Sequence, residues 1–525
     1  MSELIQSRTR NTFFNAITST VGHGISVILG FVVRMVFLQY LAIELLGVNG
    51  LFTSILTVFS LAELGFSSAV AFALYKPLAE KDERKIAAYM RYYSITYAII
   101  GIIILLIGIT ILPFLQHLIK NFEQINITLN DLRLYFSIFL ISTTSTYFFA
   151  YKRTVIISDQ KRYIVNIISI IISILSKLFQ ILLIIIFHNY LLFIAVNVIF
   201  VYTENIIISI IVDKKYKYLK LYKSEKLTIQ DKKALYINIS ALFFNKISAV
   251  FTTGIISILI SRLIGLKEAG LYSNYYLLTS AISTLLFKFT ESATASVGNF
   301  AITENKEAQK ALFKKILYFN SFFAVLFFSG LSILLNNFIE IWLGKEMILD
   351  NLLPIAMSVN LFLLLIRNTS WIFFNAFGLY RHHFYRCFLE VVLFLALAIP
   401  GAIFFGIIGI VVSRIISIIV MQFPFEIYII SKYALKEKSY FYLKYLLKYL
   451  FIALICFSIS FIISNFILLS GLIGFISKTI IISLIVVSIY YLTTFKTEEY
   501  KYYLNIIKNI FFKLKQVKTN GTTNT

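Results

Sequence analysis

Charged residues and cysteines are both scarce in this chain of 525 residues. Only 14% of its residues are Asp, Glu, Lys or Arg, whereas a soluble domain carries about 25%. Together with 59% hydrophobic residues and a mean hydropathy of +0.85, this excludes an ordinary soluble protein and predicts an all-α polytopic membrane protein. The two cysteines, Cys387 and Cys456, both stand in apolar segments, so they exclude a disulfide framework and are expected to be packing residues.

Sequence motifs of catalysis are also absent. The chain has no phosphate-binding loop of the Walker type, no HExxH, no GxSxG and no cluster of cysteine and histidine with metal-ligand spacing. Of its five histidines, His23 lies within the first span, His117 and His188 lie near outer ends, and His382 and His383 lie in a loop; histidines scattered in this way more often serve as polar or interfacial groups than as ligands. We therefore expect no catalytic residue, no metal and no cofactor, and the chain is not predicted to be an enzyme.

The net charge of +23 comes mainly from basic residues in the loops, and this placement does not indicate a surface for binding nucleic acid. Basic residues gather in every second loop and at both termini, and the loops between them hold few. This asymmetry predicts that both termini are cytoplasmic. The lysine- and arginine-rich loops that carry the signal are 76–88, 157–162, 213–234, 295–315 and 432–446.

Hydrophobic segments of about 25 residues recur along the chain, and each is long enough to cross a hydrocarbon layer of about 30 Å. We predict about 14 transmembrane helices. Their expected bounds are 13–38, 51–75, 89–113, 132–156, 163–187, 190–212, 235–259, 271–294, 312–336, 353–376, 384–404, 407–431, 447–467 and 472–494.

The hairpin formed by the first two spans is repeated about 220 residues later. Gly50-Leu51-Phe52 matches Gly270-Leu271-Tyr272. We predict two homologous, parallel six-helix halves, each starting on the cytoplasmic side, related by an axis along the membrane normal. The expected organisation is 1–225 for the N-terminal lobe, 226–435 for the C-terminal lobe, and 436–525 for two additional helices and a basic cytoplasmic tail.

In the first hairpin, a turn is expected over residues 42–50, followed by one continuous helix over 51–75. Gly65, Ala69 and Ala73 recur at every fourth position of that helix. Small residues in such a row form a flat strip, which predicts close packing against another helix.

Ionisable residues inside the spans are the main functional signal, because each costs at least about 2.5 kcal/mol to insert. Counting along each span places Lys177, Lys246 and Arg367 near the midplane, with Arg34 and Arg414 in the outer half. Glu63 is the one acidic residue placed centrally by this count. The other acids lie toward the inner ends, and they are Glu204, Glu291, Glu390 and Glu426.

Two interpretations of these charges stay open. Acids and bases can neutralise each other, as Lys288 and Glu291 would at a spacing of three residues. Alternatively, the deep cations line a cavity for an anionic substrate, since arginine grips phosphate through two parallel hydrogen bonds and lysine acts as a point charge. Glu63 is then either an ion-pair partner or a titratable carboxylate that couples transport to protons or sodium.

Three stretches carry a resemblance to a known family. They are RMVFLQYLAIELLGVNGLF from Arg34, ELGFSSAVAFALYKPLAEKD from Glu63, and IGLKEAGLYSNYYLL from Ile264. In these stretches and in its span count, the chain resembles the Wzx-type polysaccharide repeat-unit flippases of the multidrug/oligosaccharidyl-lipid/polysaccharide exporter superfamily. The resemblance covers about residues 8–495 and rests on pattern more than on an invariant signature.

The resemblance implies a V-shaped bundle that alternates access around a central cavity. It also implies an undecaprenyl-pyrophosphate-linked oligosaccharide as substrate, moved across the membrane for capsule, O-antigen or exopolysaccharide synthesis. Alternatives are a multidrug antiporter or a peptidoglycan lipid-precursor flippase on the same scaffold, and a polytopic polysaccharide polymerase. A multidrug antiporter for cationic drugs is expected to have excess carboxylate at the midplane, and a polymerase needs a larger outer segment with catalytic groups.

Overall fold

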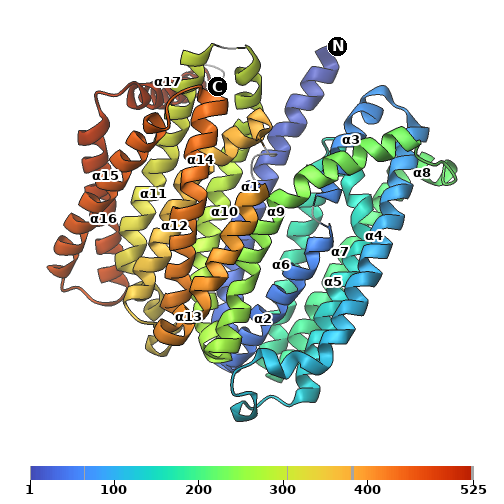
Figure 1. Ribbon diagram of the computed structural model, residues 1–525, viewed down its shortest axis with the longest axis horizontal. Coiled ribbons are helices and arrows are strands. Elements are labelled where there is room, and N and C mark those ends of the chain that lie inside the picture. Colours follow the sequence, from blue (N-terminus) through green and yellow to red (C-terminus); the bar gives the residue numbers. More distant parts are fainter. Residues whose placement is uncertain (1, 64, 304, 380–383, 522–525) are drawn as a thin grey trace. The chain divides into compact units, whose positions relative to one another are not determined.

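A computed structural model describes residues 2–63, 65–303, 305–379 and 384–521 of the chain. Helices dominate this part of the chain, which contains no strand (Figure 1). Nine of the helical segments within the described ranges are long and apolar enough to cross a membrane. The prediction of an all-α polytopic membrane protein is confirmed, and every predicted span coincides with helical structure over most of its length.

The chain divides into two compact units. Unit 1 comprises Met1–Tyr276 and His383–Ile410, and unit 2 comprises Leu277–His382 and Val411–Thr525. This division follows contacts, whereas the predicted lobes follow the repeat, so the boundaries at 225 and 435 remain predictions.

Unit 1 contains the first nine α-helices, and the helices α10 and α13 contribute residues to both units. The bounds are α1 (Ser2–Tyr40), α2 (Ile43–Phe59), η1 (Ser60–Glu63), α3 (Phe66–Glu80), α4 (Glu83–Ile111), η2 (Leu112–Leu118), η3 (Phe122–Gln124), α5 (Leu129–Ser158), α6 (Arg162–Phe187), α7 (Tyr190–Lys215), α8 (Tyr218–Leu221), α9 (Ile229–Leu263), α10 (Leu266–Thr303) and α13 (Phe384–Ser417).

Polar caps start several of these helices. The side chains of Asp82, Thr128, Asn189 and Thr228 each accept a hydrogen bond from a backbone N–H in the first turn of α4, α5, α7 and α9. Helix α5 packs against α4 and α7, α1 packs against α6, and α9 packs against α2 and α3. These contacts determine which face of each helix is turned toward a neighbouring helix of unit 1.

The hairpin between the first two spans differs from its prediction in two places. The turn predicted over 42–50 is wrong, because α2 already begins at Ile43. Gly47 then lies against the carbonyl of Leu266, where a Cβ atom would collide with backbone. Gly270 lies against the carbonyl of Ile43, where a Cβ atom would also collide with backbone. Glycine at both positions lets α2 and the start of α10 approach each other without a steric clash.

The second span is also not one continuous helix. It is interrupted by the short 3-10 turn η1 and by Gly65, whose φ of 86° lies in the left-handed region. Glycine adopts this conformation without a steric penalty, so Gly65, which is itself buried, permits the break. Ala69, one turn into α3, is buried as predicted, and α3 packs against α4, α5 and α9.

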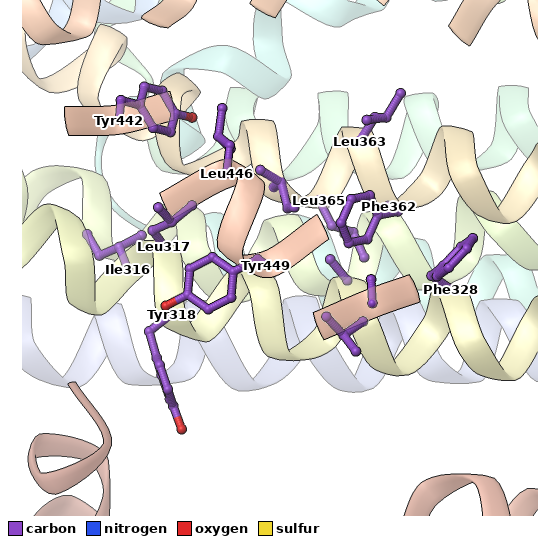
Figure 2. Close-up of a cluster of buried hydrophobic side chains, with 14 of the residues drawn as sticks. Ile316, Leu317, Tyr318, Phe328, Phe362, Leu363, Leu365, Tyr442, Leu446 and Tyr449 are labelled. Atoms are coloured by element: carbon purple, nitrogen blue, oxygen red, sulfur yellow. The ribbon is translucent and has the colours of Figure 1, made fainter. Parts of the chain in front are cut away.

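Unit 2 is built around α11 (Lys306–Leu343), which packs against α12 (Leu352–Phe377), α15 (Ser439–Asn465) and α16 (Gly471–Thr494). Figure 2 shows large side chains from α11, α12 and α15 meeting in one cluster. The hydroxyl of Tyr490 donates to the carbonyl of Tyr318 over 2.8 Å, so α16 is tied to α11. The remaining elements are η4 (Lys345–Met347), η6 (Ile418–Gln422), α14 (Phe423–Ile429), η7 (Ile430–Leu435) and α17 (Glu498–Gly521).

Candidate functional site

Arg34, on the apolar helix α1, is held by neutral partners. Its Nη1 donates to Ser273 Oγ over 2.7 Å and to Asn274 Oδ1 over 3.1 Å, and both acceptors belong to the part of α10 in unit 1. Arg34 forms no ion pair with a carboxylate of the described residues. A largely apolar segment therefore carries a cation whose charge is not balanced by an observed acid.

Asn274 adds a second unused donor beside this arginine. The side chain is fully buried, and its Nδ2 has no acceptor in the described part of the chain. Because Arg34 occupies Oδ1, the amide can offer only its N–H groups to a further partner. A buried donor left without an acceptor costs about 1–3 kcal/mol, so Arg34 and Asn274 together favour an anionic or acceptor-rich ligand.

Lys177 on α6 lies close enough to Arg34 for the two positive charges to interact, and α1 and α6 pack against each other. It makes no ion pair with any acid in the ranges that the structure describes. The neighbouring Ser176 is buried, and its hydroxyl is also without a partner there. Unit 1 thus holds two like charges close together, which repel unless an anion lies between them.

Glu63 lies at the break in the second span. It is the last residue of η1, and α3 resumes only after Gly65. A break of this kind in a transmembrane helix frees backbone groups, which membrane proteins tolerate where the segment is enclosed by protein or lines a cavity. The carboxylate is therefore placed where the span is least regular.

Tyrosine hydroxyls, and not basic residues, surround this carboxylate. Tyr97 donates to Glu63 Oε1, and Tyr147 lies within hydrogen-bonding reach of the same group. Tyr93 packs edge-on against Tyr97 with ring centroids 4.3 Å apart. No ion pair to Glu63 occurs among the described side chains, so these contacts do not support the interpretation of Glu63 as an ion-pair partner.

Arg367 of unit 2 presents the opposite arrangement. Its Nη2 lies 2.5 Å from Glu426 Oε1, and its Nε contacts both carboxylate oxygens at 3.2 Å. Both side chains are largely buried. Counting residues along the spans predicts that Arg367 and Glu426 lie at different depths in the membrane. The five-residue π-helical segment η6 and the six-residue π-helical segment η7 flank Glu426, so the helix register around Glu426 differs from that of a regular α-helix. For Arg367, neutralisation by an acid is therefore observed.

The other candidate residues are placed as follows. Arg414 Nη1 reaches Ser417 Oγ one turn later at 3.5 Å. The side chains of Lys246 and Glu291 are not among those that the structure describes. The pairing of Lys288 with Glu291 therefore stays a prediction. Of the inner acids, Glu204 pairs with Arg153 at 2.7 Å and Glu390 with Arg386 at 3.6 Å. Neutralisation is confirmed for these two acids as well.

Sequence reasoning missed the tyrosine partners and the amide of Asn274. Tyr93 and Tyr97 are spaced by four residues and so share one helix face, which was a usable signal. Nothing in the sequence distinguished Tyr147 from the other 32 tyrosines or linked Asn274 to Arg34. Within the described residues no group of three or more His, Cys, Asp or Glu side chains is arranged to hold a metal ion.

Comparison with solved structures identifies the architecture. The structure superposes on the lipid II flippase MurJ in an inward closed conformation with a TM-score of 0.66, at 15% identity, covering 90% of this chain and 98% of MurJ. The chain shares the fold of this flippase. An inward-facing multidrug resistance MATE family transporter of the MOP superfamily gives a TM-score of 0.61 at 13% identity, over 78% of this chain and 93% of the transporter.

A MATE transporter of Vibrio cholerae gives a TM-score of 0.51 at 16% identity, with 83% of this chain and 99% of that chain covered. No family model and no curated protein sequence matches the chain. The similarity therefore establishes that the chain shares the fold of these membrane transporters, and its function must be argued from the site.

Proposed function

We propose that the chain is a flippase for an undecaprenyl-pyrophosphate-linked oligosaccharide, which it moves across the bacterial cytoplasmic membrane for surface polysaccharide synthesis. The observation that carries this proposal is the pair of Arg34 and Lys177 in unit 1, close to each other and without an acid partner among the described residues. The glycan itself comes only from the sequence resemblance stated above.

A pyrophosphate must keep its charge compensated while it crosses a medium of low dielectric constant. Arg34 supplies a planar guanidinium, Lys177 a compact charge and Asn274 a buried N–H donor, and all three favour phosphate oxygens. In this proposal Lys246, Arg367 and Arg414 contribute from the second half. Arg367 would first have to exchange Glu426 for a phosphate oxygen.

Glu63 is proposed to couple transport to a proton or a sodium ion. Its hydrogen bonds come from neutral hydroxyls of Tyr97 and Tyr147, so a cation that neutralises the carboxylate would not compete with a lysine or arginine. The broken span around it offers backbone carbonyls of the kind that coordinate ions in discontinuous transmembrane helices.

A multidrug antiporter is the competing function, because MATE transporters share the fold. A site for cationic drugs needs an excess of unpaired carboxylates. Among the described residues inside the predicted spans of unit 1, Arg34 and Lys177 have no acid partner and only Glu63 is a carboxylate without a basic partner, so this balance favours an anionic cargo. A peptidoglycan lipid-precursor flippase uses the same phosphate chemistry, and it differs from our proposal in the attached sugar.

Reconstitution in liposomes tests these functions together. We expect the purified chain to flip a lipid-pyrophosphate oligosaccharide and to leave a cationic dye untransported. Flipping of lipid II in preference to polysaccharide repeat units would move the assignment to peptidoglycan synthesis, and dye export without lipid flipping would contradict the proposal.

A further inference from the structure

A lysine-lined bowl of about 800 Å³ lies at one end of unit 1, away from Arg34 and Lys177. It is formed where α7 ends, α8 follows and α4 begins (Figure 1). One acid, Glu83, stands in its wall against four lysines. The full lining is Glu83, Lys214, Lys215, Lys217, Tyr218, Lys220 and Leu221.

The nearby acids are already paired. Asp213 accepts from Lys152 at 2.7 Å and lies 3.1 Å from Lys220, and Asp159 pairs with Lys161. Lys214 and Lys217 form no ion pair with any acid in the described part of the chain. The bowl therefore has an excess of positive charge that the protein does not neutralise itself.

The segment after α8 is fastened to α4, which keeps the bowl in shape. Arg91 donates to the carbonyl of Ser224, and Arg84 lies over the ring of Tyr222 at 5.4 Å. Asp231 at the start of α9 lies 3.1 Å from Lys85. Because these contacts hold both ends of the segment, a ligand does not have to order it first.

The bowl also lies at the level where a membrane surface is expected. Lys215 ends the candidate span of α7, and Glu83 begins that of α4. Leu221 on the rim has 74% of its surface exposed, so it offers apolar surface that a lipid acyl chain at this level would cover. Basic residues directly beside spans attract anionic lipid headgroups, by about 1 kcal/mol for each lysine.

We propose that this bowl binds the phosphate headgroup of an anionic phospholipid, with Lys214 and Lys217 contacting the phosphate and Leu221 lying against the acyl chains. The site is separate from the proposed transport site, and it does not depend on the identity of the transported cargo.

Binding can be measured on the full chain in nanodiscs of phosphatidylcholine with added phosphatidylglycerol, followed by native mass spectrometry of the released protein. We expect the unaltered protein to retain phosphatidylglycerol in preference to phosphatidylcholine. The double variant Lys214→Gln/Lys217→Gln is expected to lose roughly thirtyfold in affinity, and Lys214→Arg/Lys217→Arg is expected to keep it.

The matched control is Lys436→Gln/Lys438→Gln, which removes the same charge from an exposed loop of unit 2. An equal loss in this control would show general charge attraction and would overturn the site. Displacement of the lipid by millimolar inorganic phosphate would also overturn it, because the bowl would then recognise free phosphate. The four substituted lysines are exposed and form no ion pair among the described residues, so each variant is expected to keep the unfolding temperature of the parent.

Discussion

Two arginines in apolar helices, Arg34 in unit 1 and Arg367 in unit 2, have opposite surroundings. Arg367 is matched by two oxygens of Glu426, whereas the hydrogen-bond partners of Arg34 in the described part of the chain are a hydroxyl and an amide oxygen. A buried ion pair compensates its own desolvation cost at least in part, but a buried charge with neutral partners does not. The difference indicates that Arg367 is satisfied by the protein, whereas Arg34 is available to a charged ligand.

The largest expected effect is on stability in unit 2. Arg367→Gln leaves Glu426 buried without its partner, and breaking a buried pair in this way costs about 3–5 kcal/mol. Unfolding of the purified protein in detergent should report this loss as a lower midpoint temperature. The double variant Arg367→Gln/Glu426→Gln should recover most of it, and a single variant as stable as the parent would contradict the pairing.

The next largest loss of stability is expected at Tyr97, whose hydroxyl donates a hydrogen bond to the carboxylate of Glu63. Tyr97→Phe removes one hydrogen bond to the Glu63 carboxylate, and such bonds to charged groups contribute about 1.5–3 kcal/mol. We expect a loss of stability in that range by the same unfolding measurement. In a Glu63→Gln background the substitution should cost less; an unchanged cost would mean that Tyr97 acts through packing alone.

Arg34 should show the reverse pattern from Arg367. Removing an unpaired charge from an apolar helix leaves no carboxylate stranded, so Arg34→Gln is expected to keep the unfolding temperature. Flipping of the lipid-linked oligosaccharide in liposomes should fall roughly tenfold or more, which corresponds to about 1.4 kcal/mol. Arg34→Lys, which keeps the charge, is the matched control and should retain more transport than Arg34→Gln. Full transport by Arg34→Gln would end its role in binding.

The smallest effect concerns a paired charge outside the spans. Partial burial disfavours the Asp231 carboxylate, but hydrogen bonds from Thr228 and Lys85 outweigh this and hold the pKa of Asp231 below its ordinary value. The stabilisation is therefore present above the ordinary pKa of about 3.9 and is lost as the pH falls below it.

Because such partly exposed pairs contribute only about 0.2–1 kcal/mol, Asp231→Asn should lower stability by no more than that at pH 7. At pH 3 the variant and the parent should differ less. A larger difference at pH 3 than at pH 7 would show that the carboxylate is not stabilised by its partners.

Hydropathy and charge asymmetry were enough to predict the helical spans, because a membrane demands long apolar helices with satisfied backbones. They did not predict the break at Gly65, since a single glycine in an apolar run is also common inside packed spans. They did not predict the pairing of Arg367 with Glu426 either. Counting residues assumes 3.6 per turn, and the π-helical segments around Glu426 change that register.

The site was predicted only in part for a related reason. Periodicity finds an ionisable residue inside a span but not its partner on another helix. Arg34 and Lys177 were therefore identified as candidates together with Arg367, and only their contacts separate them. The tyrosines around Glu63 come from α4 and α5, which are far from it in the sequence.

The interrupted second span bears on how the chain enters the membrane during synthesis. Helices α2 and α3 have 17 and 15 residues, so at about 1.5 Å per residue neither reaches across a hydrocarbon layer of about 30 Å. Glu63 at their junction adds about 2.5–3.5 kcal/mol to the cost of insertion. Tyr97 and Tyr147, which hydrogen-bond this carboxylate, leave the ribosome later than α3. The second span is thus expected to settle in the bilayer only once α4 and α5 have joined it, so the first five helices insert as a group.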